Sequence, residues 1–226
     1  PNITFASAIG QTLCQEGAPI ALSQIESLWL DKALSSFGFI QVATDLLPTV
    51  RPKEFFRPGQ VDPMGNFNNI SIGSNYLKPR MRLPGSGGIP DVSTYIDGIY
   101  LYVPRHSKVT FVEKLDFKSG LGHGTKRVRG SGPKYLVSNL GEFDFFDEKL
   151  RLISIHPEVH LEAVQKRTGF QFEVSKQLRV TTPPTREELS LLRNVIDPLG
   201  VRKLEFLSGH RRNTAIREIL ERETQQ

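Results

Sequence analysis

A glycine-rich loop at residues 84–91 is the stretch of this chain best suited to bind a ligand. Its sequence, PGSGGIPD, places three glycines within four residues and has prolines on both sides of them. Glycine permits dihedral angles and close approaches that a Cβ atom would forbid, and proline restricts the backbone at each end. Loops of this kind between strands commonly hold ligands. Because the pattern fits neither the P-loop nor the dinucleotide-binding motif, a tight surface turn is the alternative interpretation.

Polar side chains within and before this loop could orient a bound molecule. Gln60, Asn66 and Asn69 precede the loop and could contact a substrate, or could simply cap turns. Inside it, the Ser86 hydroxyl could bond to a substrate or only to its own loop. Asp91 could serve as a base, or could cap the turn that follows. Each of these side chains therefore has both a functional and a purely structural interpretation.

The cysteine and the histidines offer further chemistry. Cys14 could be a nucleophile or a proton carrier, although a lone cysteine is also typical of a buried apolar position. His123 lies between two glycines, where a loop could present its imidazole to a substrate or leave it in solvent. His156 and His160 have the spacing of a metal-binding pair, but they flank Pro157 and lack a clear third ligand. We therefore predict no metal site.

Composition limits the class of protein. The chain has 226 residues, a hydrophobic content of 38% and a net charge of +5. These values are ordinary for a soluble globular protein and suit a phosphate-bearing partner or a small-molecule substrate. No Lys/Arg block is dense enough to indicate nucleic-acid binding. The single cysteine excludes an intramolecular disulfide. Without a long apolar run or a signal-peptide pattern, we expect no membrane association and a cytoplasmic location.

Hydrophobic periodicity predicts strands crowded into the middle of the chain, with helices before and after them. Proline and glycine bracket one helix, and Thr185 with Glu188 forms a capping box that begins another. The expected strands are 3–9, 37–43, 99–103, 109–115, 135–139, 142–147, 150–155 and 170–174, and the expected helices are 22–36, 158–167, 185–196 and 211–223.

Domain organisation follows from this order of elements. No composition break marks a linker, so we expect a single α/β domain over residues 1–226, with a polar C-terminal helix within 207–226. The first strand begins at Ile3 with no preceding element. We therefore expect that an N-terminal strand-helix unit is absent from this chain or is supplied by a partner.

Six short motifs follow one another along the chain: QVDPMGN at 60–66, SIG at 71–73, GSGG at 85–88, VSNLG at 137–141, FQFEV at 170–174 and IDP at 196–198. Their order and spacing resemble the B (β) subunit of glutaconate CoA-transferase and its relatives in the class I CoA-transferase family. The resemblance runs from residue 1 to about residue 206.

This resemblance implies an α/β class with an open three-layer α/β/α CoA-transferase-like fold. It also implies an A (α) subunit partner in a heterodimer or heterotetramer, and an acyl-CoA substrate in which coenzyme A takes part without a separate bound cofactor. The loop residues Gly85, Ser86, Gly87 and Gly88 would then bind the substrate, and the backbone amides of Gly87 and Gly88 would form part of an oxyanion hole that faces the thioester carbonyl. Cations would bind the CoA phosphates, or would form only an exposed basic loop: Lys126, Arg127, Arg129 and Lys134.

One departure from the family pattern bears directly on the reaction. Transferases of this family attack the thioester with a glutamate at the end of a strand, two residues before a glycine. The matching position here is Ala8 when counted from Gly10, or Ala6 when the strand is aligned. Neither alanine can form an acyl anhydride, and Glu16 and Glu26 do not end an apolar strand. The residues before Gln60, RPG at 57–59, also differ from the glycine pair of the family.

We therefore expect an enzyme subunit that hydrolyses, ring-opens or decarboxylates an acyl-CoA thioester, with acid or base groups supplied by the A subunit. Relatives that lack the glutamate resemble ring-opening hydrolases and decarboxylases. Two alternatives stay open: a true CoA-transferase subunit, and a non-catalytic subunit that supports the site of its partner. The sequence identifies no catalytic side chain of its own.

Overall fold

The computed structural model describes residues 5–7, 12–50, 52–124, 127 and 129–225. These fall into two compact units, which are described separately: one comprises Pro1–Thr44 and Pro183–Gln226, and the other Asp45–Thr182. Among the described helices, none is both long and apolar enough to cross a membrane. The mixture of helices and a central mixed sheet confirms the predicted α/β class.

The first unit combines a small antiparallel sheet with helices from both ends of the chain. Its strands lie in the order β1-β2-β3. They are β1 (Phe5–Ser7), β2 (Thr12–Cys14) and β3 (Ala33–Ser36). The helical segments are α1 (Ile25–Asp31), α2 (Phe39–Gln41), α6 (Arg186–Leu191), a π-helical segment η2 (Leu192–Ile196), a 3₁₀ helix η3 (Val201–Phe206) and α7 (Gly209–Glu223). The boundary between the units falls within a π-helical segment, η1 (Val42–Leu46).

Glu223 of α7 fixes a segment from the other end of the chain within this unit. Its side chain is 2% exposed. The carboxylate accepts hydrogen bonds from the backbone N–H of Leu22, from the hydroxyl of Ser23 and, at 3.0 Å, from the backbone N–H of Ser23. The Gln24 side chain in turn donates to the Glu223 carbonyl oxygen at 3.2 Å. These contacts join the buried carboxylate to the 22–24 segment, so that the carboxylate has hydrogen-bond partners.

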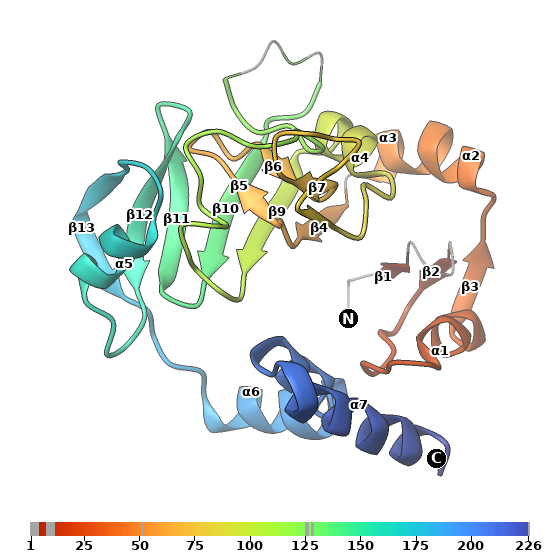
Figure 1. Cartoon of the computed structure of the whole chain (residues 1–226). Helices are drawn as coiled ribbons and strands as arrows, with labels where there is room; N and C mark the ends of the chain where they lie inside the picture. Colours follow the sequence, from red (N-terminus) through yellow and green to blue (C-terminus); the bar gives the residue numbers. More distant parts are fainter. Residues whose placement is uncertain (1–4, 8–11, 51, 125–126, 128, 226) are drawn as a thin grey trace. The chain divides into compact units, whose positions relative to one another are not determined.

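The second unit is built on a six-stranded sheet in the order β13-β12-β11-β10-β9-β4 (Figure 1). Strands β4, β9 and β10 run parallel, as do β12 and β13, whereas β11 is antiparallel to both of its neighbours. The strands are β4 (Lys53–Phe56), β9 (Gly98–Val103), β10 (Pro133–Ser138), β11 (Gly141–Phe146), β12 (Lys149–Ile155) and β13 (Glu173–Val180). Two ribbons pair β5 (Gln60–Val61) with β6 (Phe67–Asn68) and β7 (Ser71–Ile72) with β8 (Met81–Arg82), and the helices are α3 (Leu47–Val50), α4 (Ile89–Tyr95) and α5 (Leu161–Arg167).

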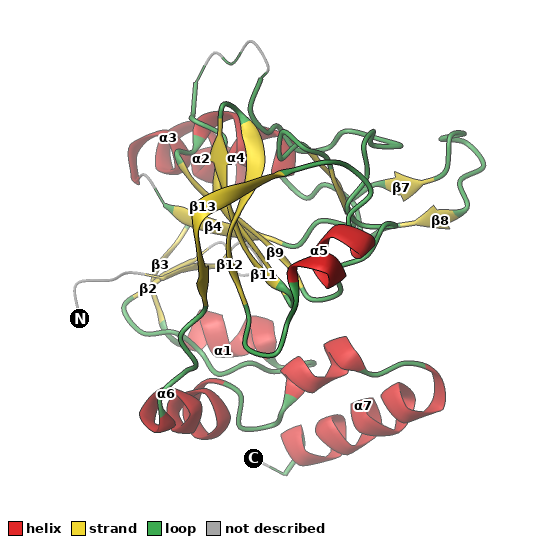
Figure 2. Cartoon of the chain, turned by 90° about the vertical axis from the view of Figure 1, so that its left-hand side faces the viewer, coloured by secondary structure: helices red, strands yellow, loops and turns green. Residues whose placement is uncertain are grey.

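One face of this sheet carries the core of the unit. Along β9, Ile99 and Leu101 are buried while Tyr100 and Tyr102 point to the other face, as the two-residue period of a strand requires. α5 packs on the core face through Val164 (Figure 2). Loops and α4 complete this layer, with buried side chains that include Phe67, Ile89, Ile96 and Phe111.

Two predicted strands are wrong, and the helix expected over 22–36 is confirmed only over Ile25–Asp31 of α1. Residues 109–115 form no strand; Phe111 is fully buried but makes only an isolated bridge to Val61. Residues 39–43 of the strand expected over 37–43 are helical, and residues 33–36 form β3 rather than the end of a helix. A short apolar run is compatible with a strand, a helix or a buried loop, so periodicity alone cannot distinguish them.

Other boundaries are confirmed or displaced by a few residues. The strands β10, β11 and β12 match the prediction closely, and the Thr185–Glu188 capping box is present at the start of α6. The helix expected over 158–167 begins at Leu161, with His160 at the N-cap. The strand expected over 170–174 is instead β13, which begins at Glu173. The polar C-terminal helix is α7, while the expected single domain and absent N-terminal unit stay predictions.

Candidate functional site

The glycine loop connects β8 to α4 in the second unit and depends on three residues with positive φ. Gly85, Gly87 and Gly88 have φ values of +114°, +40° and +87°, which L side chains rarely adopt. An added Cβ atom would meet no atom within 4 Å at any of the three. Backbone conformation, rather than lack of space, therefore requires glycine here, and the surroundings of the loop are open.

The loop is anchored at its two ends. At its start, the Gly85 N–H donates to the Asn69 carbonyl oxygen at 2.9 Å. At its end, the Ser86 carbonyl oxygen accepts from the Ile89 N–H at 2.6 Å. Within the described part of the chain, no hydrogen bond uses the N–H groups of Ser86, Gly87 and Gly88 or the Ser86 hydroxyl. The loop thus presents consecutive backbone donors that no other group of the described chain occupies.

Gln60 lies close to this loop in the sequence and belongs to a buried polar network. Its side chain is 4% exposed. The Oε1 atom accepts from Asn68 Nδ2 at 2.8 Å and from the Asp116 N–H at 3.2 Å, while Nε2 donates to Asp116 Oδ2 at 3.0 Å. The same Asp116 oxygen also accepts from the Gly73 N–H at 3.0 Å. Gln60 is therefore engaged inside the chain, and a direct contact with substrate stays a prediction.

Asn66 closes the turn before the loop and is 2% exposed. Its Nδ2 donates to both carboxylate oxygens of Asp62, at 3.2 and 2.9 Å, and its Oδ1 accepts from the Gly122 N–H at 2.9 Å. Burial raises the pKa of Asp62, and the hydrogen bonds from Asn66 oppose that shift. Asn66 therefore joins the 62–66 turn to the segment around Gly122, and its predicted substrate contact is untested.

Asn69 links the same network directly to the glycine loop. Its carbonyl oxygen holds Gly85, its Oδ1 accepts from the Gly59 N–H at 2.9 Å, and its own N–H donates to Ser119 Oγ at 2.9 Å. Sequence reasoning missed Asn68, Asp116 and Ser119. The cluster of asparagines at 66, 68 and 69 could have indicated Asn68. No local pattern indicates Asp116 or Ser119, because they lie 56 and 50 residues from Gln60 and Asn69, respectively.

Arg127 holds two segments of backbone together. Its guanidinium donates to carbonyl oxygens of Gly122 at 2.9 Å, of Gly130 at 3.2 Å and of Ser93 in α4. Burial lowers the pKa of Arg127, and the charge of Asp97 opposes this shift. The predicted binding of CoA phosphate by Arg127 would compete with these bonds and stays a prediction. Lys126 lies outside the described residues.

His123 is also held by the chain. Its backbone N–H donates to the Met64 carbonyl oxygen at 2.7 Å, and Nε2 donates to the Pro133 carbonyl oxygen at 2.7 Å. Its ring lies 4.4 Å from that of Phe145, measured between centroids. Because Nε2 faces a carbonyl oxygen, it carries the hydrogen. A catalytic role for His123 would have to use the opposite ring nitrogen, and that role stays a prediction.

The candidates near the family glutamate position belong to the first unit. Cys14 is fully buried; its Sγ donates to the Trp29 carbonyl oxygen at 3.4 Å. The Ala6 backbone pairs with Leu13 in the antiparallel β1–β2 pair. Ala8 and Gly10 lie outside the described residues. The burial of Cys14 favours its structural interpretation, and its catalytic role stays untested.

His106 is a buried residue that the sequence did not single out. Its Nδ1 lies 2.9 Å from Ser138 Oγ, and its Nε2 lies 2.9 Å from Thr168 Oγ1. The ring stacks on Phe111 at a centroid distance of 3.6 Å. Burial, together with the charge of Arg167, lowers the pKa of His106 to about 3. It is therefore neutral near pH 7 and serves as a packing and hydrogen-bonding centre.

His156 and His160 do not form a metal pair with a third ligand. His156 bonds through Nδ1 to Thr181 Oγ1 at 3.0 Å and through Nε2 to the Ser138 carbonyl oxygen at 2.8 Å. Over the residues that the structure describes, no three His, Cys, Asp or Glu side chains are grouped to hold a metal ion. Asp91 is exposed in the first turn of α4.

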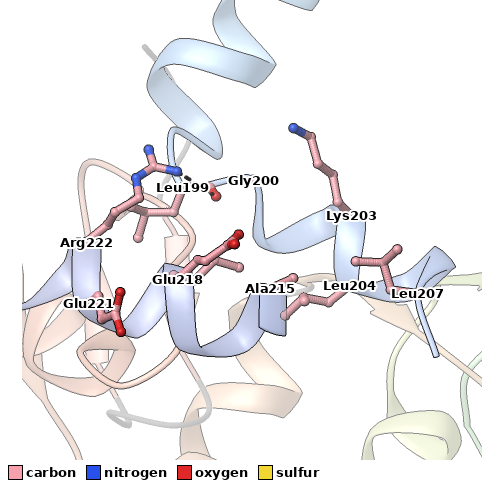
Figure 3. A pocket seen from close by; sticks show the side chains of 10 residues that line it. Leu199, Gly200, Lys203, Leu204, Leu207, Ala215, Glu218, Glu221 and Arg222 are labelled. Atoms are coloured by element: carbon pink, nitrogen blue, oxygen red, sulfur yellow. Dashed lines mark hydrogen bonds between the residues drawn. The ribbon is translucent and has the colours of Figure 1, made fainter. Parts of the chain in front are cut away.

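The first unit contains a separate cavity of about 410 Å³, between η3 and α7. Figure 3 shows Lys203 and Arg222 on opposite sides of it, with Leu204 and Ala215 along its wall. Glu218 also lines it, so its charges are mixed. None of the residues predicted to bind substrate lines this cavity, and we place the candidate site at the glycine loop instead.

Comparison with known proteins relates the chain to one family. Residues 58–167 match the sequence model described as coenzyme A transferase. The chain is 34% identical over 148 residues to the B subunit of 3-oxoadipate CoA-transferase from Pseudomonas knackmussii, covering 62% of this chain and 56% of that protein. It is 35% identical over 158 residues to the cholesterol ring-cleaving hydrolase IpdB subunit of Mycobacterium bovis, covering 66% of this chain and 62% of that protein. The chain thus spans little more than half the length of these curated relatives.

A solved structure shows the same fold. The crystal structure of the decarboxylase AibA/AibB aligns with a TM-score of 0.74 and 27% identity, and the alignment covers 90% of this chain and 80% of that chain. The region matched by the sequence model includes the glycine loop, the polar network around it and strands β9 to β12.

Proposed function

Because this chain belongs to the coenzyme A transferase family, we propose that it is the B subunit of a two-subunit enzyme that acts on an acyl-CoA thioester. The curated relatives are named as B subunits, and the similar solved structure is a complex named from two components. By analogy, an A-type subunit is the partner, in a heterodimer or heterotetramer. Coenzyme A enters as part of the substrate, and no further cofactor is required for this chemistry.

The free backbone donors of the glycine loop carry this proposal. A thioester carbonyl oxygen gains negative charge when its carbon is attacked, and fixed N–H donors stabilise that charge. The N–H groups of Gly87 and Gly88 donate no hydrogen bond within the described chain and lie in open surroundings. They are therefore available to a thioester oxygen. Each such donor typically stabilises a transition state by about 3 kcal/mol.

We assign the reaction to hydrolysis, ring opening or decarboxylation rather than CoA transfer. The expected glutamate position is occupied by alanine in either register, Ala6 or Ala8. Alanine cannot form the acyl anhydride on which transfer depends. The names of similar proteins include a ring-cleaving hydrolase and a decarboxylase. In hydrolysis, water would add to the thioester carbon, the C–S bond would break, and the CoA thiolate would take up a proton.

The acid and base groups are assigned to the A subunit. Within this chain, His123 and Cys14 donate to backbone carbonyl oxygens, and His106 is buried and neutral. The loop of this chain would then orient the carbonyl oxygen, while the partner moves protons.

The test is turnover by the complex. The chain is co-purified with its A subunit, mixed with a panel of acyl-CoA thioesters and analysed by intact-mass spectrometry and product chromatography. We expect substrate consumption without a covalent adduct. A CoA or acyl adduct on either subunit would identify a true CoA-transferase instead.

A non-catalytic supporting subunit is the second candidate. The observation that favours it is that His123, Cys14 and His106 are all hydrogen-bonded inside the chain. It predicts that changes in the glycine loop leave turnover intact when the complex still assembles. Loss of turnover on changing Gly87, with assembly preserved, would exclude it.

A further inference from the structure

A second cavity in the Asp45–Thr182 unit lies apart from the glycine loop. It has a volume of about 560 Å³ and is lined by His106, Ser107, Lys108, Ala163, Lys166 and Arg167. It is formed by the segment that follows β9 and by α5. In open α/β sheets, ligands commonly bind beyond the carboxyl ends of parallel strands. The segment at 104–108 occupies that position with respect to β9.

The charge of this cavity is entirely positive. Three of its six lining residues are cations, and no carboxylate lines it. Lys108, Lys166 and Arg167 are exposed, and none of them forms a hydrogen bond or ion pair within the described chain. Glu113 is not among these lining residues; it lines an adjacent cavity, which shares Lys108. The helix dipole offers another reason for Lys166 and Arg167, because cations are stabilised near the last carbonyl groups of a helix such as α5. It does not explain Lys108, which belongs to a different segment.

The wall that carries Lys108 is rigidly built. The His106 N–H donates to Asn139 Oδ1 at 2.8 Å, and the Ser107 carbonyl oxygen accepts from the N–H groups of Thr110 at 3.0 Å and Phe111 at 2.8 Å. The His106 ring is held by two side-chain hydrogen bonds and by stacking. A pre-organised wall reduces the entropy lost when a ligand binds.

We propose that this cavity binds a phosphate-bearing small molecule, with Lys108, Lys166 and Arg167 contacting its phosphate oxygens. Three cations that line one cavity match a multiply charged anion, and the planar guanidinium of Arg167 suits two phosphate oxygens. The volume exceeds that of a single small ion and fits a pyrophosphate or part of a nucleotide. The phosphates of coenzyme A or those of a separate phosphorylated molecule supply this chemistry. The inference does not rest on the proposed reaction.

Isothermal titration of the full chain with inorganic pyrophosphate tests the proposal. We expect saturable binding to one site, weakened more than about tenfold in the variant Lys108→Gln/Lys166→Gln/Arg167→Gln. The matched control, Lys149→Gln/Lys176→Gln/Arg179→Gln, removes the same charge from exposed positions of β12 and β13. We expect it to change the dissociation constant less than about twofold.

Three results would overturn the proposal: no saturable binding to the unmodified chain, unchanged binding to the cavity variant, or an equal loss in the control. Thermal unfolding of each variant verifies the fold, and the single variant Lys108→Glu provides a second test with minimal disturbance. Competition with coenzyme A identifies the source of the phosphate. Displacement of pyrophosphate by coenzyme A indicates the substrate, and simultaneous binding indicates a separate molecule; either result supports the site.

Discussion

Asn69 and Gly85 are joined by a hydrogen bond of 2.9 Å from the Gly85 N–H to the Asn69 carbonyl oxygen. This bond fixes the start of the glycine loop on a polar network, because Asn69 also binds Gly59 and Ser119. The three amides that follow Gly85 lie beyond this anchor and have no partner in the described chain. The network thus supports the loop, and the loop presents its donors to a ligand.

The first prediction concerns the free amides of this loop. Replacing Gly87 with Ala forces a Cβ atom onto a backbone with φ of +40°, which displaces the adjacent N–H groups. We expect kcat of the complex to fall about tenfold or more. Gly209→Ala is the matched control, because Gly209 also has positive φ and open surroundings but lies at the start of α7. Equal activity of the two variants would contradict an oxyanion role for the loop.

The second prediction concerns Asn66. Its replacement by Ala removes the two side-chain hydrogen bonds to the half-buried Asp62 carboxylate and leaves the buried Gly122 N–H without its acceptor. Asp62 then keeps the backbone N–H donors of Met64 and of residue 66. We expect the free energy of unfolding to fall by about 1–3 kcal/mol, measured by urea denaturation. Asn194→Ala, at an exposed helical position, is the control and should change stability by less than about 0.5 kcal/mol. A stable Asn66→Ala variant with raised KM would instead indicate direct substrate binding.

The third prediction concerns the pH dependence due to His106. Its pKa in the folded chain is about 3, below the usual value, so the unfolded chain binds more protons at moderately acidic pH. In the unfolded chain the pKa of a histidine is about 6.5. The stability that neutral His106 contributes is therefore fully present above this pH and is lost progressively as the pH falls below it. Between pH 7.5 and 5.5 we expect it to decrease by about 1.4 kcal/mol.

Urea denaturation across this pH range provides the measurement. His106→Gln should be less stable at pH 7.5 but should show a smaller decrease on acidification than the unmodified chain. His160→Gln, at the exposed N-cap of α5, should retain the larger decrease. Parallel curves for all three proteins would show that His106 does not contribute this proton linkage.

The fourth prediction tests what Arg127 does. Lysine has a single ammonium group and cannot reach the separate carbonyl oxygens of Ser93, Gly122 and Gly130 together. We expect Arg127→Lys to lower the free energy of unfolding by about 1–2 kcal/mol. Arg129→Lys, at an exposed position over the Tyr95 ring, is the control. A raised KM for acyl-CoA without loss of stability would support phosphate binding by Arg127.

The fifth prediction concerns the link between the ends of the first unit. Glu223→Ala removes the acceptor for the N–H groups of Leu22 and Ser23. We expect hydrogen exchange of these two amides to accelerate about tenfold or more. The control Glu221→Ala changes an exposed carboxylate on the same helix and should leave their exchange unchanged. Unchanged exchange in Glu223→Ala would show that other contacts protect this segment.

Local sequence determined the features whose causes are local. Alternating apolar residues predicted strands β10, β11 and β12, and Thr185 with Glu188 predicted the capping box of α6. Three closely spaced glycines predicted a loop of unusual backbone conformation, and all three have positive φ. The alanines at positions 6 and 8 are facts of the sequence itself, as is the absence there of a carboxylate. Each of these depends on a side chain and its immediate neighbours.

Tertiary structure alone decided which polar groups meet. Gln60 and Asp116 are 56 residues apart, and Arg127 reaches a carbonyl oxygen of Ser93. His106 finds its two side-chain partners on β10 and after α5. Periodicity shows which face of an element is apolar, but it does not show which distant segment covers that face. A buried polar group must find a partner somewhere, and the path of the whole chain determines which partner it finds.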